Sequence, residues 1–263
     1  LPQASTMMGV PTFYTRLLAD DRFTREASQH MRLFISGSAP LLAETHKSFE
    51  ARTGKKILER YGMTETNMNT SNPYDGERIA GTVGVPLPGV ELRIADAKTG
   101  KSLPDGEIGI IELKGDNVFT GYWQMPEKTA ESFRDDGFFI TGDMARIDEN
   151  GYVVIVGRDK DLLISGGLNV YTKEIERLID EVSAVTESAV IGVPHPDVGE
   201  AVVAVIVAED ASLDEARVMG FVADKLAKFK QPKAVFFVDA LPRNTMGKVQ
   251  KVTLRAEHKG LFA

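Results

Sequence analysis

The stretch that decides the fold reads Ile57-Leu58-Glu59-Arg60-Tyr61-Gly62-Met63-Thr64-Glu65-Thr66. Its apolar start predicts a strand over residues 57–61, and Gly62 then allows the backbone to approach a ligand closely. Upstream, residues 11–19 and 41–52 have helical spacing, residues 33–35 read as a short buried strand, and Gly54 is a stop signal for the second helix. This alternation predicts a parallel sheet whose loops gather at the strand ends. We expect Phe13, Leu17 and Leu18 to form the apolar side of the first helix, and Pro40 to begin the second.

Further along the chain the texture changes twice. From about Gly81, glycine and proline separate short apolar stretches, which is typical of a small antiparallel barrel or meander. After Gly157, two short strands flank Gly166-Gly167 as a hairpin, and a helix follows with Thr172 as its cap. The predicted fold class is therefore α/β followed by α+β. The predicted domains are residues 1–157, divided into an α/β piece (1–80) and a barrel-like piece (81–157), and a small domain of residues 158–263.

Composition excludes several classes of function. The chain has 263 residues, a net charge of -7 and no cysteine, which excludes disulfides, thiolate metal sites and cysteine nucleophiles. The acidic balance argues against a general nucleic-acid partner. The longest apolar run, residues 201–208, is too short to span a membrane, and no signal-peptide pattern opens the chain. We therefore expect a cytoplasmic protein with neither a nucleic-acid nor a membrane partner.

Two loops that follow predicted strands carry candidate ligand-binding residues. Small residues at Ser38-Ala39-Pro40 permit close approach of a planar ring. In the decisive stretch, Tyr61 offers a flat face to a base, a Thr64 hydroxyl can meet a phosphate oxygen, and Glu65 can hold a magnesium ion bound to phosphate. Each loop on its own is equally explained as an ordinary turn.

Three later motifs point in the same direction. Asp143, after Thr141-Gly142, can accept hydrogen bonds from a ribose diol, and Arg158 can also reach ribose hydroxyls. The glycine hairpin at Gly166-Gly167 can admit a narrow ligand arm past the backbone. Lys248 follows a glycine turn, and a loop lysine can neutralise charge on a transferring phosphoryl group. The plain alternatives are a turn, a charged linker and a solvated surface lysine.

The order and spacing of these motifs resemble the superfamily of acyl-CoA synthetases, luciferases and peptide-synthetase adenylation domains. Residues 115–122, preceded by Lys114, are similar to the Gly-x-x-x-x-x-Gly-Tyr element of that family. The resemblance extends from about Val10 to Lys251. It implies an ATP-dependent, AMP-forming enzyme in which an acid attacks the α-phosphate, a small carboxyl-terminal domain rotates, and coenzyme A then displaces AMP.

The resemblance also implies a role for each matching residue. Ser38, Ala39 and Pro40 would line the adenine site with Tyr61, within the motif that continues through Gly62 and Met63. Thr64 would touch the α-phosphate, and Glu65 would hold magnesium. Asp143 and Arg158 would hold the ribose, Lys160 would be the hinge, Gly166 and Gly167 would border the pantetheine tunnel, and Lys248 would be the adenylation lysine.

The residues around Tyr61 also indicate which acid is activated. Arg60 would be out of place in a fatty-acid pocket, but a guanidinium suits a second carboxylate because the two groups pair in a two-pronged fashion. Arg16 supplies another cation upstream. The string of residues 58–65 resembles the malonyl- and methylmalonyl-CoA synthetase branch, which favours malonate. The plain alternative is that Arg60 pairs with Glu59 or another acid.

One feature of the family has no counterpart here. No Ser/Thr/Gly-rich phosphate loop ending in Pro-Lys occurs in the sequence, and the first residue is Leu1. We therefore expect a carboxyl-terminal fragment that does not adenylate alone. The alternatives are a ligase for a monocarboxylic (medium-chain or aromatic) acid, a peptide-synthetase adenylation domain, a non-catalytic nucleotide-binding module, and a plain α/β domain with accidental motifs.

Overall fold

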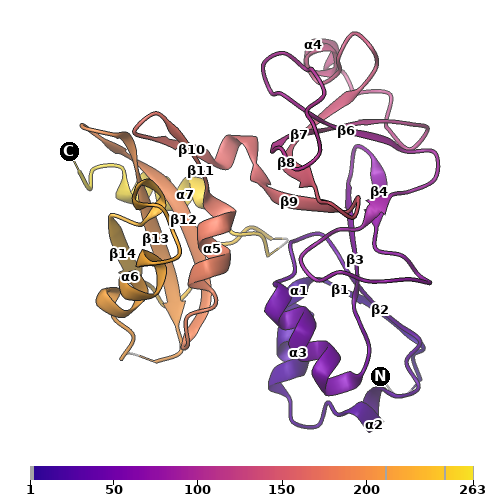
Figure 1. Ribbon diagram of the computed structural model, residues 1–263, viewed down its shortest axis with the longest axis horizontal. Helices are drawn as coiled ribbons and strands as arrows, with labels where there is room; N and C mark the ends of the chain where they lie inside the picture. Colours follow the sequence, from indigo (N-terminus) through magenta and orange to yellow (C-terminus); the bar gives the residue numbers. More distant parts are fainter. Residues whose placement is uncertain (1–2, 211, 246, 263) are drawn as a thin grey trace. The chain divides into compact units, whose positions relative to one another are not determined.

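The computed structural model describes residues 3–210, 212–245 and 247–262. The chain divides into two compact units, Leu1–Ile155 and Val156–Ala263, each with its own sheets and helices (Figure 1). Each unit is described by itself below.

The first unit begins with a five-stranded sheet in the order β1-β2-β3-β4-β5. Its strands are β1 (Thr6–Gly9), β2 (Leu33–Ser36), β3 (Leu58–Met63), β4 (Asn67–Ser71) and β5 (Val85–Pro86). The first three strands are parallel, as predicted, and the last two pair antiparallel. The parallel pairs need crossover connections, which the helices between them supply.

Helices α1 (Pro11–Ala19), α2 (Arg25–Ser28) and α3 (Ala43–Thr53) accompany this sheet. Together with the strands they enclose an aromatic-rich core of Tyr14, Phe23, Met31, Phe34, Leu41, Phe49 and Ile57. Helix α1 has its predicted bounds, and α3 ends at Gly54, which has φ of 74° in the left-handed region.

Two sequence-based expectations for these helices were wrong. Leu17 and Leu18 pack against the core as expected, but Phe13 is 46% exposed, and Tyr14, which lies three and four residues before them, completes the buried face instead. Pro40 does not begin α3, since Leu42 is its N-cap and Leu41 instead enters the core.

The rest of the first unit is a four-stranded sheet in the order β6-β7-β8-β9. Its elements are β6 (Glu91–Ala95), β7 (Gly109–Lys114), helix α4 (Pro126–Glu131), β8 (Phe139–Ile147) and β9 (Val153–Arg158), which runs across the boundary between the units. Strands β6, β7 and β8 pair antiparallel, in agreement with the predicted meander. Its apolar side chains, among them Ile111 and Leu113, pack with Tyr61 of β3.

The second unit is an α+β domain with the strand order β11-β10-β13-β12, and β14 pairs parallel with β13. In chain order its elements are the 3-10 turn η1 (Asp159–Asp161), β10 (Leu162–Ser165), β11 (Leu168–Tyr171), α5 (Thr172–Ile179), β12 (Val185–His195), β13 (Gly199–Ala208), α6 (Glu215–Ala223), the 3-10 turn η2 (Lys228–Lys230), β14 (Ala234–Phe237) and α7 (Lys251–His258). One core cluster contains residues of α5 and α6, and another contains Leu254 of α7. The predicted hairpin is present, with φ of 58° at Gly166 and 79° at Gly167, as a two-residue primed turn requires.

Thr172 is not the cap of α5. The N-cap is Tyr171, which makes no side-chain capping bond, and Thr172 is the first helical residue. Its hydroxyl instead accepts a hydrogen bond from the Lys251 ammonium at 2.9 Å. A contact with a residue so distant in sequence leaves no local signal.

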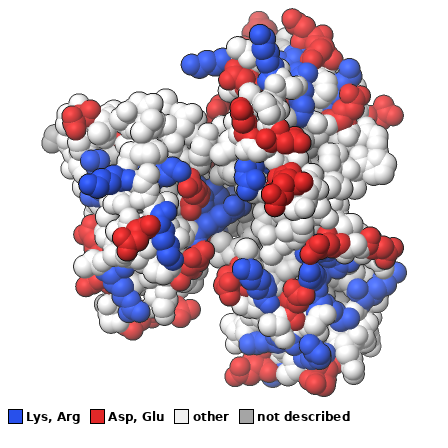
Figure 2. Space-filling view, in the orientation of Figure 1, with Lys and Arg blue, Asp and Glu red and all other residues white. Residues whose placement is uncertain are grey.

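In the view of Figure 2, lysine and arginine side chains alternate with aspartate and glutamate over the visible faces of both units. Within the described ranges, none of the helices is both long enough and apolar enough to span a bilayer.

Candidate functional site

The carboxyl ends of the three parallel strands meet at one edge of the first sheet. Gly9 of β1 is in register with Ser36 of β2, and Ser36 is in register with Glu59 of β3. The residue just after the end of β2 is Gly37, and a side chain added there would meet the backbone oxygen of Arg60 at 3.4 Å. The two loops that sequence analysis singled out therefore begin side by side at this edge, where ligands bind in parallel α/β sheets.

Arg60 is half-buried at this edge, and two methionines surround its guanidinium. One terminal nitrogen, Nη2, donates to Met8 Sδ at 2.9 Å, and the other donates to Met68 Sδ. The third nitrogen, Nε, is buried and has no hydrogen-bond partner in the part of the chain that the structure describes. Thioether sulfur is a weak acceptor, so these contacts leave most of the hydrogen-bonding capacity of Arg60 unused.

Arg60 and Glu59 point to opposite faces of β3, because side chains alternate along a strand. The Glu59 carboxylate lies 3.4 Å from His46 Nδ1 in the interior. Among residues 3–210, 212–245 and 247–262, no carboxylate forms an ion pair with Arg60. Pairing between Arg60 and Glu59, the plain alternative from sequence, is therefore absent from the described contacts.

The Ser38-Ala39-Pro40 loop is exposed beyond the end of β2. Ser38 has φ of 67°, the left-handed region that a serine seldom occupies. Such backbone strain concentrates at ligand-binding loops. The adenine-site role of these residues stays a prediction.

Tyr61 joins two motifs that are far apart in sequence. Its side chain is 8% exposed, and its hydroxyl donates to Asp143 Oδ2 at 2.6 Å. Sequence reasoning placed Tyr61 at the base and Asp143 at the ribose of one nucleotide, but gave no contact between them. The hydrogen bond fixes the orientation of the Asp143 carboxylate, which is itself buried.

Asp143 is aimed by an irregularity in strand β8. Ile110 pairs with Met144 and Glu112 with Ile140, so Thr141, Gly142 and Asp143 together face the single residue between them on β7. Gly142 takes φ of 69° in this bulge, and the Thr141 hydroxyl donates to the Ile111 carbonyl at 2.8 Å. Bulges of this kind redirect a side chain beside a functional site.

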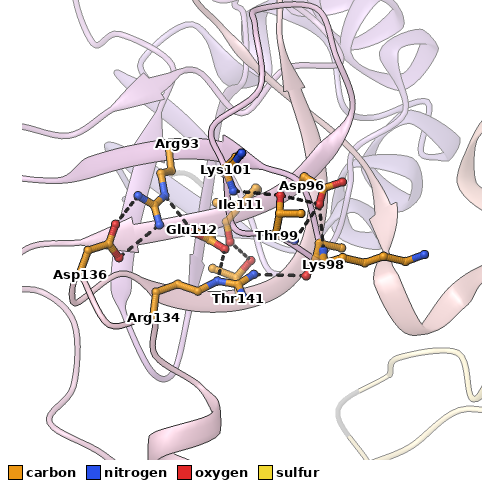
Figure 3. A network of polar contacts seen from close by, with 11 residues as sticks. Arg93, Asp96, Lys98, Thr99, Lys101, Ile111, Glu112, Arg134, Asp136 and Thr141 are labelled. Atoms are coloured by element: carbon orange, nitrogen blue, oxygen red, sulfur yellow. Dashed lines mark hydrogen bonds and ion pairs between the residues drawn. The ribbon is translucent and has the colours of Figure 1, made fainter.

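A buried ion network holds the strands beside the bulge (Figure 3). The Glu112 carboxylate of β7 is fully buried between the guanidinium groups of Arg93, at 2.7 Å, and Arg134, at 2.8 Å. Arg93 also contacts Asp136 at 2.6 Å. Removing one partner of such a network would leave a buried charge uncompensated, so the network keeps β6 and β7 fixed relative to the turn before β8.

Thr64 and Glu65 lie in the turn between β3 and β4. Thr64 is exposed, and the Glu65 carboxylate accepts a hydrogen bond from the Tyr122 hydroxyl at 3.0 Å. Burial and the nearby Glu65 carboxylate raise the pKa of Tyr122, so this hydroxyl stays a donor. Asn117 of the same downstream loop donates to the Thr66 carbonyl at 2.7 Å. The loop of residues 115–122 thus holds the Thr64–Glu65 turn in place through these two hydrogen bonds.

The donor set of this turn fits magnesium as a phosphate-bound ion. No group of at least three His, Asp or Glu side chains able to hold a metal occurs in the described part of the chain. Magnesium does not need one, because it commonly uses one or two carboxylates together with substrate phosphates and water. The hydrogen bond from Tyr122 engages Oε1 of Glu65.

In the second unit, the predicted residues lie at a strand end, in turns and in a loop. Arg158 ends β9, Lys160 is exposed in the turn η1, and Gly166 and Gly167 form the exposed tip of the β10–β11 hairpin. Lys248 is exposed in a small loop, where its backbone N–H donates to Asn244 Oδ1 at 3.0 Å. Its side chain makes no hydrogen bond or ion pair with the residues that the structure describes.

Sequence reasoning missed Met8, Met68 and Tyr122 as neighbours of the site. Tyr122 had a usable signal, because it ends the glycine-flanked element of residues 115–122. The sequence around Met8 and Met68 contains no signal that they lie beside Arg60. Their position depends on the order of the strands in the sheet, which decides which side chains flank Arg60. Arg16, the second predicted arginine, is exposed in the last turn of α1.

Two family descriptions match this chain. Residues 3–123 match the AMP-binding enzyme family, and residues 174–248 match the AMP-binding enzyme C-terminal domain. The first match includes the loops at the edge of the parallel strands, and the second ends at Lys248.

Similar proteins and structures span both units. The chain is 42% identical to a malonate–CoA ligase of Arabidopsis thaliana, over 94% of the chain and 43% of the relative. It is 38% identical to a long-chain-fatty-acid–CoA ligase of Yersinia pestis, over 96% of the chain and 45% of the relative. Among solved structures, ATP-bound MatB from Rhodopseudomonas palustris has a TM-score of 0.96 and 64% identity, over 99% of this chain and 52% of MatB. The chain thus spans about half the length of these relatives.

Proposed function

Because the chain belongs to the family of AMP-binding enzymes, we propose that the protein is an AMP-forming acid–CoA ligase and that its acid is malonate. The observation that carries this proposal is the guanidinium of Arg60 at the carboxyl edge of the parallel strands. It contacts thioethers and has no carboxylate partner in the described chain.

The surroundings of Arg60 favour a dicarboxylic acid. One carboxylate of malonate would pair with Arg60 while the other reacts. Met8 and Met68 offer the guanidinium only weak thioether acceptors, so a carboxylate would displace these contacts in favour of charged hydrogen bonds. A fatty acid would instead place a methyl end against the cation and remove water from it without compensation. The similarity to a malonate–CoA ligase and to MatB supports the same choice.

The first half-reaction brings a carboxylate toward the α-phosphate of ATP, and like charges repel. We assign Lys248 to offset this charge and Thr64 to donate to the α-phosphate. Magnesium, when bound to the phosphates, would neutralise further negative charge, and Glu65 would hold it. Tyr61 and Asp143, already joined, would orient the ribose with Arg158, beside an adenine site at Ser38, Ala39 and Pro40.

The second half-reaction transfers the acyl group from AMP to the thiol of coenzyme A. Glycine at positions 166 and 167 leaves the tip of the β10–β11 hairpin without side chains. We assign this tip to the pantetheine arm, and Lys160 to the hinge between the two half-reactions.

The test replaces Arg60 with alanine in the intact protein and compares malonate with butyrate. We expect kcat/KM for malonate to fall about 100-fold or more, because a two-pronged charged hydrogen bond is lost. Activity with butyrate should hold or rise. Thioester formation at saturating ATP and coenzyme A gives both values.

Two further variants complete the comparison. Arg60→Lys keeps the charge but not the fork, so malonate activity should be intermediate. Arg22→Ala removes an arginine that pairs with Asp20 on the surface and should leave discrimination unchanged. Equal discrimination by wild type and Arg60→Ala would exclude Arg60 as the carboxylate ligand and favour a monocarboxylic acid.

A further inference from the structure

Lys248 lies in a loop that closes on itself. The Gln250 N–H donates to the Pro242 carbonyl at 2.8 Å, and the Asn244 N–H donates to the Lys248 carbonyl at 3.0 Å. Gly247 turns with φ of 77°, and its carbonyl accepts from Arg243 Nη1 at 2.5 Å. These hydrogen bonds tie Lys248 to the residues on either side of it, and the direction of Lys248 depends on what holds the base of the loop.

The base of the loop is fastened by Lys251, the first residue of α7. The Lys251 side chain is 15% exposed, and its ammonium lies 2.5 Å from Glu176 Oε1. It also donates to the Thr172 hydroxyl at 2.9 Å. Lys251 is three residues after Lys248 in the chain. A displacement of the Lys251 side chain would therefore move the backbone at the base of the loop.

Glu176 on α5 is the central residue of the polar contacts that hold Lys251. Its side chain is 4% exposed, and Oε1 also accepts the Val190 N–H of β12 at 2.9 Å, while Oε2 lies 3.1 Å from Lys173 Nζ. Burial alone would raise the pKa of Glu176, but Lys173 and Lys251 outweigh it and hold the pKa below its usual range. One carboxylate thus joins α5, β12 and the start of α7.

Stability alone is a poor explanation for this arrangement. Leu254 of α7 and Leu241 before the loop already pack in the apolar cluster that holds both ends. Exchanging a buried ion pair for apolar residues of similar volume is often neutral or stabilising, so added stability does not by itself account for the charges placed here. The directional contacts of Glu176 specify the rotation and the axial position of α7. Apolar packing between leucines is not directional and specifies these less strictly.

We propose that Glu176 is a positioning residue for Lys248 and acts through Lys251. The proposal rests on the proposed function, in which Lys248 serves the adenylation half-reaction. The proposal predicts that replacing Glu176 slows adenylate formation. The thioester step should be spared, because it does not use Lys248.

The test uses Glu176→Gln and Lys251→Met in the intact protein. Malonate-dependent release of pyrophosphate reports adenylation, and AMP-dependent exchange of labelled coenzyme A into malonyl-CoA reports the second half-reaction alone. We expect kcat for adenylation to fall about 10- to 100-fold, since a displacement near 1 Å has effects of this size. KM for malonate and the exchange rate should stay within about twofold, because neither depends on the direction of Lys248.

Two control variants separate position from charge. Lys251→Arg keeps a cation at Glu176 and should restore most of the adenylation rate. Glu174→Gln removes the other carboxylate pair of α5, with Lys230 at 2.8 Å, and should change neither half-reaction. An equal fall of both half-reactions together with a lower melting temperature, or wild-type adenylation by Lys251→Met, would overturn the proposal.

Amide hydrogen exchange tests the same proposal without activity. The Lys248 and Gln250 amides, which are hydrogen-bonded in wild type, should exchange faster in Glu176→Gln and Lys251→Met but not in Glu174→Gln. Unchanged protection would contradict the proposal. If the wild-type protein showed no activity with malonate, the proposed function would be contradicted. Amide hydrogen exchange would then decide whether Glu176 positions the Lys248 loop.

Discussion

At the scale of single residues, Gly62 shows how the site edge depends on a missing side chain. A Cβ at this position would lie 2.1 Å from the Asn67 carbonyl oxygen and 2.5 Å from Met68 Cε. The crowding arises where the β3–β4 register shifts between Tyr61 and Gly62. The glycine thus lets β4 return closely along β3, and this return brings Met68 to Arg60.

Replacing Gly62 with alanine should therefore destabilise the first unit. Because the nearest atom is backbone and cannot rotate away, we expect a loss of about 2–4 kcal/mol in the free energy of unfolding. Urea unfolding followed by far-ultraviolet circular dichroism measures it. Gly220→Ala is the matched control, because its Cβ would meet no atom within 4 Å and alanine favours the helix α6. Equal stability of the two variants would contradict the steric account.

Arg60 shows which properties of a single residue can be predicted from sequence and which cannot. Its position one residue before Tyr61 indicated a charged acyl site, and strand alternation separates it from Glu59. Its methionine neighbours come from β1 and β4, on either side of β2 and β3. Local periodicity carries no information on strand order, so these contacts could not be predicted.

At the scale of elements, helix α5 carries the buried Glu176, and the half-buried Asp180 lies at its carboxyl end. Asp180 caps its carboxyl end and accepts a hydrogen bond from the Ser188 hydroxyl at 2.6 Å. Burial raises the pKa of Asp180 to about 6, against the lowering effects of Ser188 and Lys173, while Glu176 and Glu187 raise it further. A carboxylate at a helix carboxyl terminus is also unfavourable to the helix dipole.

Asp180 should make the protein less stable as pH rises from about 4 to about 6. Its folded pKa lies above the ordinary value of 3.8, so the folded state keeps a proton that the unfolded chain has already lost. Asp180→Asn keeps an acceptor for Ser188 and removes this titration. Above pH 6 the variant should be more stable than wild type by up to roughly 3 kcal/mol, with the difference vanishing near pH 4.

Thermal unfolding followed by circular dichroism between pH 4 and 7 checks this expectation. A difference between Asp180→Asn and wild type that is constant over this range would show that Asp180 does not titrate as described. Glu174→Gln is a control on the same helix, because it removes an exposed carboxylate and should not reproduce this pH dependence.

Elements were predictable where their signals are local. Helix α1, the stop at Gly54 and the glycine hairpin follow from spacing and from backbone conformations that glycine permits. The start of α3 and the cap of α5 were wrong because Leu41 and Thr172 have partners elsewhere in the fold. In both cases a tertiary contact outweighed a local preference.

At the scale of the whole molecule, the order of motifs along the chain identified the family, and both family matches agree with it. Sequence alone did not give the bond between Tyr61 and Asp143, which are 82 positions apart, or the fastening of Lys251 by Glu176. Such contacts depend on how sheets and helices pack, and no residue pattern near either partner encodes them.

The proposed reaction of the intact protein joins malonate to coenzyme A with formation of AMP. The most direct measurement supplies the intact protein with ATP, magnesium, coenzyme A and a panel of acids, and identifies the thioester by mass. We predict malonyl-CoA and AMP in equal amounts, with malonate preferred over butyrate and benzoate by about 100-fold or more in kcat/KM, because those acids offer Arg60 no second carboxylate. A medium-chain or aromatic thioester as the main product, or nucleotide binding without any thioester, would contradict the claim.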